Sequence, residues 1–170
     1  METFNLITQA IEESKPTFIP NAFPFKPDID FNVLTKIINS GNGASKIKVQ
    51  PPVGLNQSDV LLNPFQYTDV QNSKEVNPIH TLIFKNLSDR YNIDRADFFF
   101  SMKRSIGVAH IDKENSLILG VYNKTFYRFE NLDITISIGP GDVLLSPSVH
   151  THFAMSYHER IILSWGLYKK

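Results

Sequence analysis

The sequence contains no cysteine among its 170 residues. This absence excludes disulfide scaffolds, zinc sites built on thiolates and enzymes that use a cysteine nucleophile. Any metal site in this chain must therefore be built from histidine, carboxylate or water ligands.

The sequence also lacks net charge, since 17 basic residues balance 17 acidic residues. Proteins that capture nucleic acid collect phosphates with a positive field, so the composition gives no strong nucleic-acid signal. Apolar runs long enough to span a bilayer are absent, and the first residues carry no basic segment ahead of their apolar positions. We therefore expect a cytoplasmic protein without a membrane partner.

The overall composition is that of a globular protein, with 42% hydrophobic and 20% charged residues. The length suits one domain, and no internal repeat or Gly/Ser linker divides the chain. We predict a single domain over residues 1–170, in which residues 1–96 form a helical and irregular cover and residues 97–170 form a β-barrel core.

Helical signals and a long polar segment occupy the first part of the chain. Apolar spacing predicts helices over residues 4–14, 28–41 and 77–92, with Gly41 ending the second and Asn77 and Pro78 beginning the third. Residues 46–52 fit a short strand. Residues 51–75 are rich in Asn, Gln, Ser and Pro, which favours a long loop that could serve as a functional lid.

After residue 97 the chain becomes a series of short segments rich in β-branched and aromatic residues. These segments predict strands over residues 98–103, 116–122, 125–130, 133–138, 143–146, 152–156 and 160–168. Tight turns are expected at residues 123–124 and at 139–142, where Gly-Pro-Gly-Asp fits a type II turn. Closely spaced antiparallel strands predict a mainly β fold, a small barrel or jelly roll with flanking N-terminal helices.

His110 and Asp112 are the first candidate metal ligands. They are two residues apart, so on an extended strand both side chains leave the same face and can reach one ion. Five histidines and 17 acids in this length give about half of one such pair by chance, so the spacing alone is weak. His80, opposite the apolar face of its helix, and His158, in a charged turn, are expected to be ordinary polar residues.

Two longer stretches strengthen the case that His110 and Asp112 are metal ligands. GVAHIDKENSLILGVYNKTFYRF, residues 107–129, and GPGDVLLSPSVHTHFA, residues 139–154, resemble the cupin-like and Jumonji C-like members of the iron(II) and 2-oxoglutarate-dependent oxygenases. The family carries His-x-Asp near the start of a double-stranded β-helix and a distal histidine after a Gly-Asp turn and a proline. The resemblance covers residues 97–168, with a looser lead-in ahead of them.

The resemblance implies iron(II) as cofactor, 2-oxoglutarate and dioxygen as co-substrates, and hydroxylation of a C–H bond, with a protein or peptide side chain as the favoured substrate. Two histidines and one carboxylate bind one face of iron(II) and leave the remaining positions open for these co-substrates. His110, Asp112 and His152 are the implied metal ligands and catalytic residues. His150 stays as the alternative to His152, because both lie on one face of an extended segment.

The implied cation for the distal carboxylate of 2-oxoglutarate is not settled by the sequence. One branch of the family places it near Thr125, where Lys124 is one residue out of register, and another places an arginine on the last strand, where Arg160 is followed by Ser164. Arg160, Ile162, Ser164 and Gly166 share one face of that strand, and a lone arginine there suits an anion. Tyr122 and Tyr127 are further candidates for the bound acid, with a core position as the alternative.

Two other functions stay open. The chain could be a metal-binding cupin that does not use 2-oxoglutarate, or a noncatalytic jelly-roll module whose histidines are ordinary polar residues. A homodimer is compatible with the sequence, which does not determine the oligomeric state.

Overall fold

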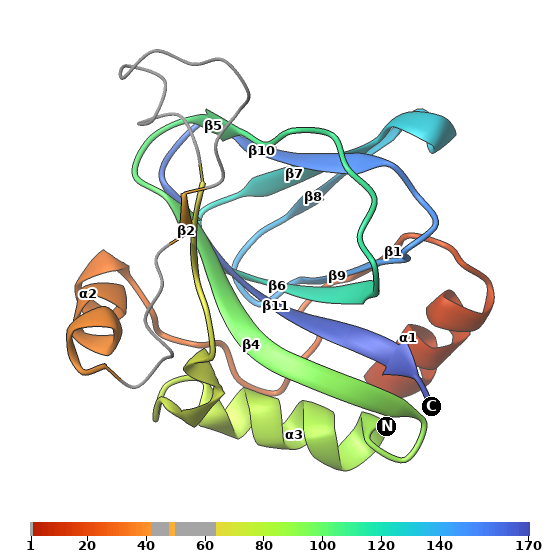
Figure 1. The fold of residues 1–170 in the computed structure, drawn as a ribbon, viewed down its shortest axis with the longest axis horizontal. Helices are drawn as coiled ribbons and strands as arrows, with labels where there is room; N and C mark the ends of the chain where they lie inside the picture. Colours follow the sequence, from red (N-terminus) through yellow and green to blue (C-terminus); the bar gives the residue numbers. More distant parts are fainter. Residues whose placement is uncertain (1, 42–47, 50–63) are drawn as a thin grey trace.

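The strands of the computed structural model form two antiparallel sheets that face each other (Figure 1). The structure describes residues 2–41, 48–49 and 64–170. The larger sheet has the order β1-β9-β6-β11-β4-β3-β2 and the smaller sheet the order β5-β10-β7-β8. This arrangement confirms the predicted mainly β, double-stranded β-helix fold.

The strand bounds are as follows. The larger sheet contains β1 (Thr17–Ile19), β2 (Lys48–Val49), β3 (Phe65–Tyr67), β4 (Tyr91–Ser101), β6 (Asn115–Tyr122), β9 (Val143–Ser146) and β11 (Arg160–Lys169). The smaller sheet contains β5 (Ser105–Ile106), β7 (Thr125–Phe129), β8 (Ile134–Ile138) and β10 (His152–Ser156). Short 3-10 helices occur at Val70–Asn72 and Glu130–Leu132.

Three α-helices, α1 (Glu2–Glu12), α2 (Phe31–Asn39) and α3 (Asn77–Leu87), lie on the outer side of the larger sheet (Figure 1). The carboxylate of Asp30 caps α2 by accepting the Val33 N–H at 2.8 Å. Gly41 follows the end of α2 with a positive φ of 66°, as the sequence predicted. In α3 the predicted cap is shifted, because Val76 precedes the helix and the Asn77 amide bonds the Gln71 carbonyl instead.

Two apolar cores result from this layering. The larger core lies between the helices and the outer face of the larger sheet, with the fully buried Trp165 and Leu163 of β11 against Ile79 and Ile83 of α3. A smaller core between the two sheets contains Phe129 and the buried residues Ile118, Tyr127, Ile138, Leu144 and Ile162. Successive residues of β11 therefore enter opposite layers, which confirms the predicted alternation of its faces.

Two glycines, one in a turn and one in β6, allow tight packing of the backbone. Gly141 has a φ of 91°, which fits the third position of the predicted type II turn. Gly120 lies so close to this turn that a Cβ on it would stand 2.0 Å from the Gly139 carbonyl oxygen. Gly120 is thus required by packing rather than by its own backbone conformation.

Several boundaries differ from the prediction. β4 begins at Tyr91 rather than near residue 98, because its polar first half pairs with the end of β11. β3 lies within the segment predicted as a loop, where it pairs with β4. The earlier part of that loop, residues 50–63, lies outside the described residues. No helix in the described ranges is long and apolar enough to cross a membrane.

Candidate metal centre

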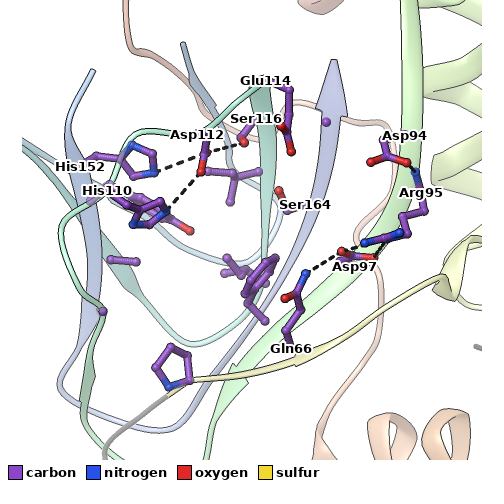
Figure 2. Close-up of a pocket in the computed structure, with 18 of the residues that line it drawn as sticks. Gln66, Asp94, Arg95, Asp97, His110, Asp112, Glu114, Ser116, His152 and Ser164 are labelled. Atoms are coloured by element: carbon purple, nitrogen blue, oxygen red, sulfur yellow. Dashed lines mark hydrogen bonds and ion pairs between the residues drawn. The ribbon is translucent and has the colours of Figure 1, made fainter. Parts of the chain in front are cut away.

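His110, Asp112 and His152 come together at one edge of the smaller sheet (Figure 2). His110 and His152 exchange both of their backbone hydrogen bonds, each at 2.9 Å, which fixes the two segments side by side. The two Nε2 atoms lie 3.2 Å and 3.6 Å from different oxygens of Asp112. One nitrogen or oxygen from each residue lies within 4.8 Å of the others.

Neighbouring groups orient these three side chains. Nδ1 of His110 lies 2.8 Å from the Val108 carbonyl oxygen, which directs Nε2 toward Asp112. Nδ1 of His152 lies 3.2 Å from the His150 carbonyl. The Ser116 hydroxyl donates to the second oxygen of Asp112 at 2.7 Å. Such outer contacts fix the tautomer and orientation of metal-binding residues.

The electrostatics of the cluster favour a carboxylate beside histidines. Burial tends to raise the pKa of Asp112, but hydrogen bonds from His110 and Ser116 outweigh it and hold that pKa below its usual value. The hydrogen bond to Asp112 raises the pKa of His110. Burial lowers the pKa of His152, which keeps its ring neutral and able to coordinate.

A cavity of about 300 Å³ opens in front of the triad, between the two sheets. Arg160 and Tyr127 line it together with Gln66 and Asp97. Figure 2 shows Gln66 and Asp97 next to each other, apart from His110, Asp112 and His152. Ile118 and Ile162 contribute apolar surface. The cavity therefore joins a metal-binding cluster to a buried cation.

Arg160 is almost completely buried, with 1% of its surface exposed. Its Nη1 lies 3.5 Å from the Thr125 hydroxyl, and it also hydrogen-bonds Tyr127. Its Nε is buried without a hydrogen-bond partner, and no carboxylate in the described part of the chain lies within ion-pair distance. A buried guanidinium without a counter-ion is costly and forms a ready site for an anion.

Burial affects the pKa of both members of the Arg160–Tyr127 contact. Desolvation lowers the pKa of Arg160 from its ordinary high value, while the contact with Tyr127 opposes that change. Desolvation raises the pKa of Tyr127 to about 12, so its hydroxyl is neutral at physiological pH. The pair therefore presents one positive charge and one neutral hydroxyl to the cavity.

The structure separates His150 from the triad. His150 precedes β10 in a bend, so it does not share a strand face with His152 as the sequence suggested. Its Nδ1 accepts the Asn131 amide at 2.9 Å, and its Nε2–H donates to the Ser14 carbonyl at 2.7 Å. Both ring nitrogens are therefore occupied, and the Nε2 contact ties the N-terminal segment at Ser14 to this bend.

The other residues that were predicted to bind 2-oxoglutarate differ in whether they lie at the cavity. Ser164 lines the cavity, and the fully buried Thr125 contacts Arg160. Lys124 is exposed in the hairpin turn, where it borders a separate depression, and the Tyr122 ring packs edge-on against Phe31 at 5.7 Å. The structure thus places Lys124 and Tyr122 away from the cavity, because the turn directs them out of the space between the sheets.

The two histidines that were expected to be ordinary polar residues, His80 and His158, have different surroundings. His158 is exposed, as expected. His80 is half-buried and accepts the Trp165 indole N–H at 3.2 Å, so it has a structural partner that the helical pattern did not indicate. Gln66 and Asp97, which the sequence did not single out, line the cavity because β3 pairs with β4.

No model of a known protein family matches the sequence, and no curated protein matches it either. Solved structures do resemble the fold. The Escherichia coli protein YcfD is 18% identical, with a TM-score of 0.69 over 96% of this chain and 53% of that one. A structure of YcfD described as a ribosomal oxygenase in complex with cobalt and 2-oxoglutarate is 19% identical, with a TM-score of 0.66 over 92% of this chain and 48% of that one.

A Burkholderia pseudomallei oxidoreductase of the 2-oxoglutarate–Fe(II) oxygenase family is similar over nearly its whole length. It is 14% identical, with a TM-score of 0.59 over 98% of this chain and 91% of that one. The present chain therefore spans about half the length of YcfD and almost all of the smaller oxidoreductase. At these identities the likeness establishes the fold, and the predicted resemblance in fold is confirmed.

Proposed function

We propose that this chain is an iron(II) and 2-oxoglutarate-dependent oxygenase that hydroxylates its substrate. The observation that carries the proposal is one cavity that joins a His-Asp-His cluster to a buried, unpaired guanidinium. The fold shared with a 2-oxoglutarate–Fe(II) oxygenase family protein, and with YcfD in complex with cobalt and 2-oxoglutarate, supports the same function.

The donor set suits iron(II). Adjacent ligands of an octahedral ion with bonds of about 2.1 Å stand about 3 Å apart. The distances of 3.2 Å and 3.6 Å between the imidazole nitrogens and Asp112 are close to that spacing. Two histidines and one carboxylate are the donor set of non-haem iron(II) oxygenases. His110, Asp112 and His152 would therefore hold the ion.

The buried cation suits the distal carboxylate of 2-oxoglutarate. Nε and the Nη groups of Arg160 would donate to it, and the Tyr127 and Thr125 hydroxyls lie beside the same guanidinium. The other end of the co-substrate, a carboxylate next to a keto group, has two oxygens suited to the open side of the metal. Ser164 lines the same cavity and is a further contact for the acid.

When iron is bound, it supplies the oxidation of a C–H bond to an alcohol by dioxygen, as 2-oxoglutarate is converted to succinate and carbon dioxide. The chain contributes placement: the outer contacts of His110 and His152 hold the ring orientations, and Ile118 and Ile162 exclude water beside the site. By analogy with YcfD, which is described as a ribosomal oxygenase, a protein side chain is the proposed substrate.

An anaerobic titration with iron(II) and then 2-oxoglutarate tests this function. We expect the weak visible charge-transfer band of a keto acid chelated to iron, and its loss in Asp112→Ala. His150→Ala is the matched control, since that histidine lies outside the triad and should leave the band intact. Iron binding without a band would favour a cupin that does not use 2-oxoglutarate. No iron binding would favour the noncatalytic module.

A further inference from the structure

The side-chain amide of Gln66 has a fixed orientation at the wall of the cavity. Its Nε2 donates to Oδ2 of Asp97 at 2.8 Å. A carboxylate only accepts hydrogen bonds, so the nitrogen and not the oxygen must face Asp97. Figure 2 shows the nitrogen of Gln66 directed to Asp97 and its oxygen turned away from that carboxylate.

Asp97 is itself held in place from two directions. Its Oδ1 accepts the backbone N–H of Asp69 at 3.1 Å, and Nε of Arg95 lies 3.3 Å from the same oxygen. Arg95 also lies 3.9 Å from Asp69, so the guanidinium bridges the two acids. These contacts make the Asp97 carboxylate a rigid acceptor on β4 for the amide on β3.

The oxygen of Gln66 is left without a donor in the described part of the chain, although Gln66 lines the cavity. The cavity lining also includes the carboxylates of Asp94 and Glu114, which only accept, and the guanidinium of Arg95, which donates. The Nε of Arg95 lies against Asp97 and Asp69, whereas the Gln66 oxygen lines the cavity as a neutral acceptor.

We propose that Gln66 determines substrate specificity by accepting an N–H of the substrate with its Oε1, and that Asp97 is the positioning residue that keeps this oxygen facing the cavity. The inference rests on the proposed oxygenase function and adds the chemistry of the substrate group, which must carry an N–H donor. A group that offers only acceptors would face Oε1 without forming a hydrogen bond to it, which is unfavourable.

Asp97→Asn gives a sharp test because it should turn the Gln66 amide around. Asparagine has one side-chain oxygen, and we expect it to accept the hydrogen bond from the Asp69 N–H. The NH2 group of the asparagine would then donate to the Gln66 oxygen, so that Nε2 of Gln66 faces the cavity. The variant thus exchanges an acceptor for a donor at Gln66 without changing the Gln66 side chain itself.

The assay is succinate formation stimulated by blocked pentapeptides of the form Gly-Gly-X-Gly-Gly. X is lysine, arginine or glutamine as the set with a side-chain N–H, and methionine or glutamate as the set without one; the backbone N–H groups are the same in both sets. Each rate is divided by the same variant's peptide-independent succinate formation. This normalisation separates the two proposals, because the peptide-independent reaction reports the oxygenase function alone.

In the wild-type protein we expect donor-bearing peptides to have a kcat/KM about tenfold above the other set. Asp97→Asn should reduce or reverse that preference, mainly through KM, and Gln66→Met should abolish it. In the Gln66→Met background, Asp97→Asn should have no further effect on the preference, which a merely structural role for Asp97 would not predict.

Three results would overturn the inference: no preference in the wild-type protein, an unchanged preference in a folded Asp97→Asn variant, or an unchanged preference in Gln66→Met. The same holds if no donor-bearing peptide stimulates turnover while peptide-independent succinate formation is intact. If that formation is itself absent, the oxygenase function fails first.

Discussion

Replacing Arg160 by methionine should weaken the binding of 2-oxoglutarate without lowering the stability of the fold. Methionine fills a similar volume but removes the guanidinium that we assign to the distal carboxylate of 2-oxoglutarate. In the described residues this group is 1% exposed, has an Nε without a hydrogen-bond partner and lacks a carboxylate partner. Its burial is therefore a cost to folding, which methionine relieves.

The expected loss of affinity follows from the contacts available. Removing one partner of a buried, hydrogen-bonded charge pair costs about 2 to 5 kcal/mol. At 1.4 kcal/mol for each factor of ten, the Kd for 2-oxoglutarate should rise roughly 30- to 4,000-fold. The iron affinity should change little, since Arg160 contacts Tyr127 and Thr125 rather than the triad.

The assay combines anaerobic titration of 2-oxoglutarate into the iron-loaded protein with thermal unfolding of the apoprotein. We expect a large loss of affinity together with a Tm that is unchanged or higher. Arg128→Met is the control, because Arg128 pairs with the exposed Asp133 on the surface and should leave the affinity unaltered. A Tm lowered by several degrees with unchanged affinity would refute the reasoning and make Arg160 a structural residue.

Three further outcomes are expected. His152→Ala should lose bound iron in a metal analysis whereas His150→Ala keeps it, and equal loss in both would contradict the assigned triad. Burial lowers the pKa of His80, so the folded state favours the neutral ring. This contribution to stability is present above about pH 6.5 and is lost as the pH falls below that value. The decrease in Tm on acidification should therefore be smaller in His80→Phe. Gly120→Ala should lower the free energy of unfolding measured with denaturant by about 3 kcal/mol, because its Cβ would overlap a carbonyl oxygen. Gly139→Ala, whose Cβ would make an ordinary 3.5 Å contact, should lower it far less. Equal losses in the two variants would refute the close approach at Gly120.

The barrel strands could be predicted because each one carries its own local signal. β6, β7, β9, β10 and β11 lie within a residue or two of their predicted bounds. β3 and the first half of β4 could not be found in this way. Their polar residues, such as Gln66 and Asp94, resemble those of a loop, and only pairing with a distant strand makes them extended.

The candidate site shows the same limit. The His-x-Asp spacing and the Gly-Asp turn indicated the cluster, but the choice between His150 and His152 depends on partners far away in the sequence. Asn131 and Ser14 occupy the ring of His150, and no local pattern contains them. Lys124 was a candidate because it lies one residue from the expected position near Thr125, and a one-residue change of register reverses the direction of a side chain. Arg160 was a candidate because another branch of the family places an arginine on the last strand.

The separation of the metal cluster and Arg160 between two sheets has a consequence for co-substrate length. His152 belongs to the smaller sheet, whereas Arg160 starts a strand of the larger one and reaches across to Thr125. Under the proposed function, the packing of the two sheets, rather than either strand alone, therefore sets the distance that 2-oxoglutarate would span between the cluster and Arg160. A four-carbon or six-carbon homologue would then reach either the metal cluster or Arg160 but not both. Mutations in the core between the sheets would change the length of keto acid that fits.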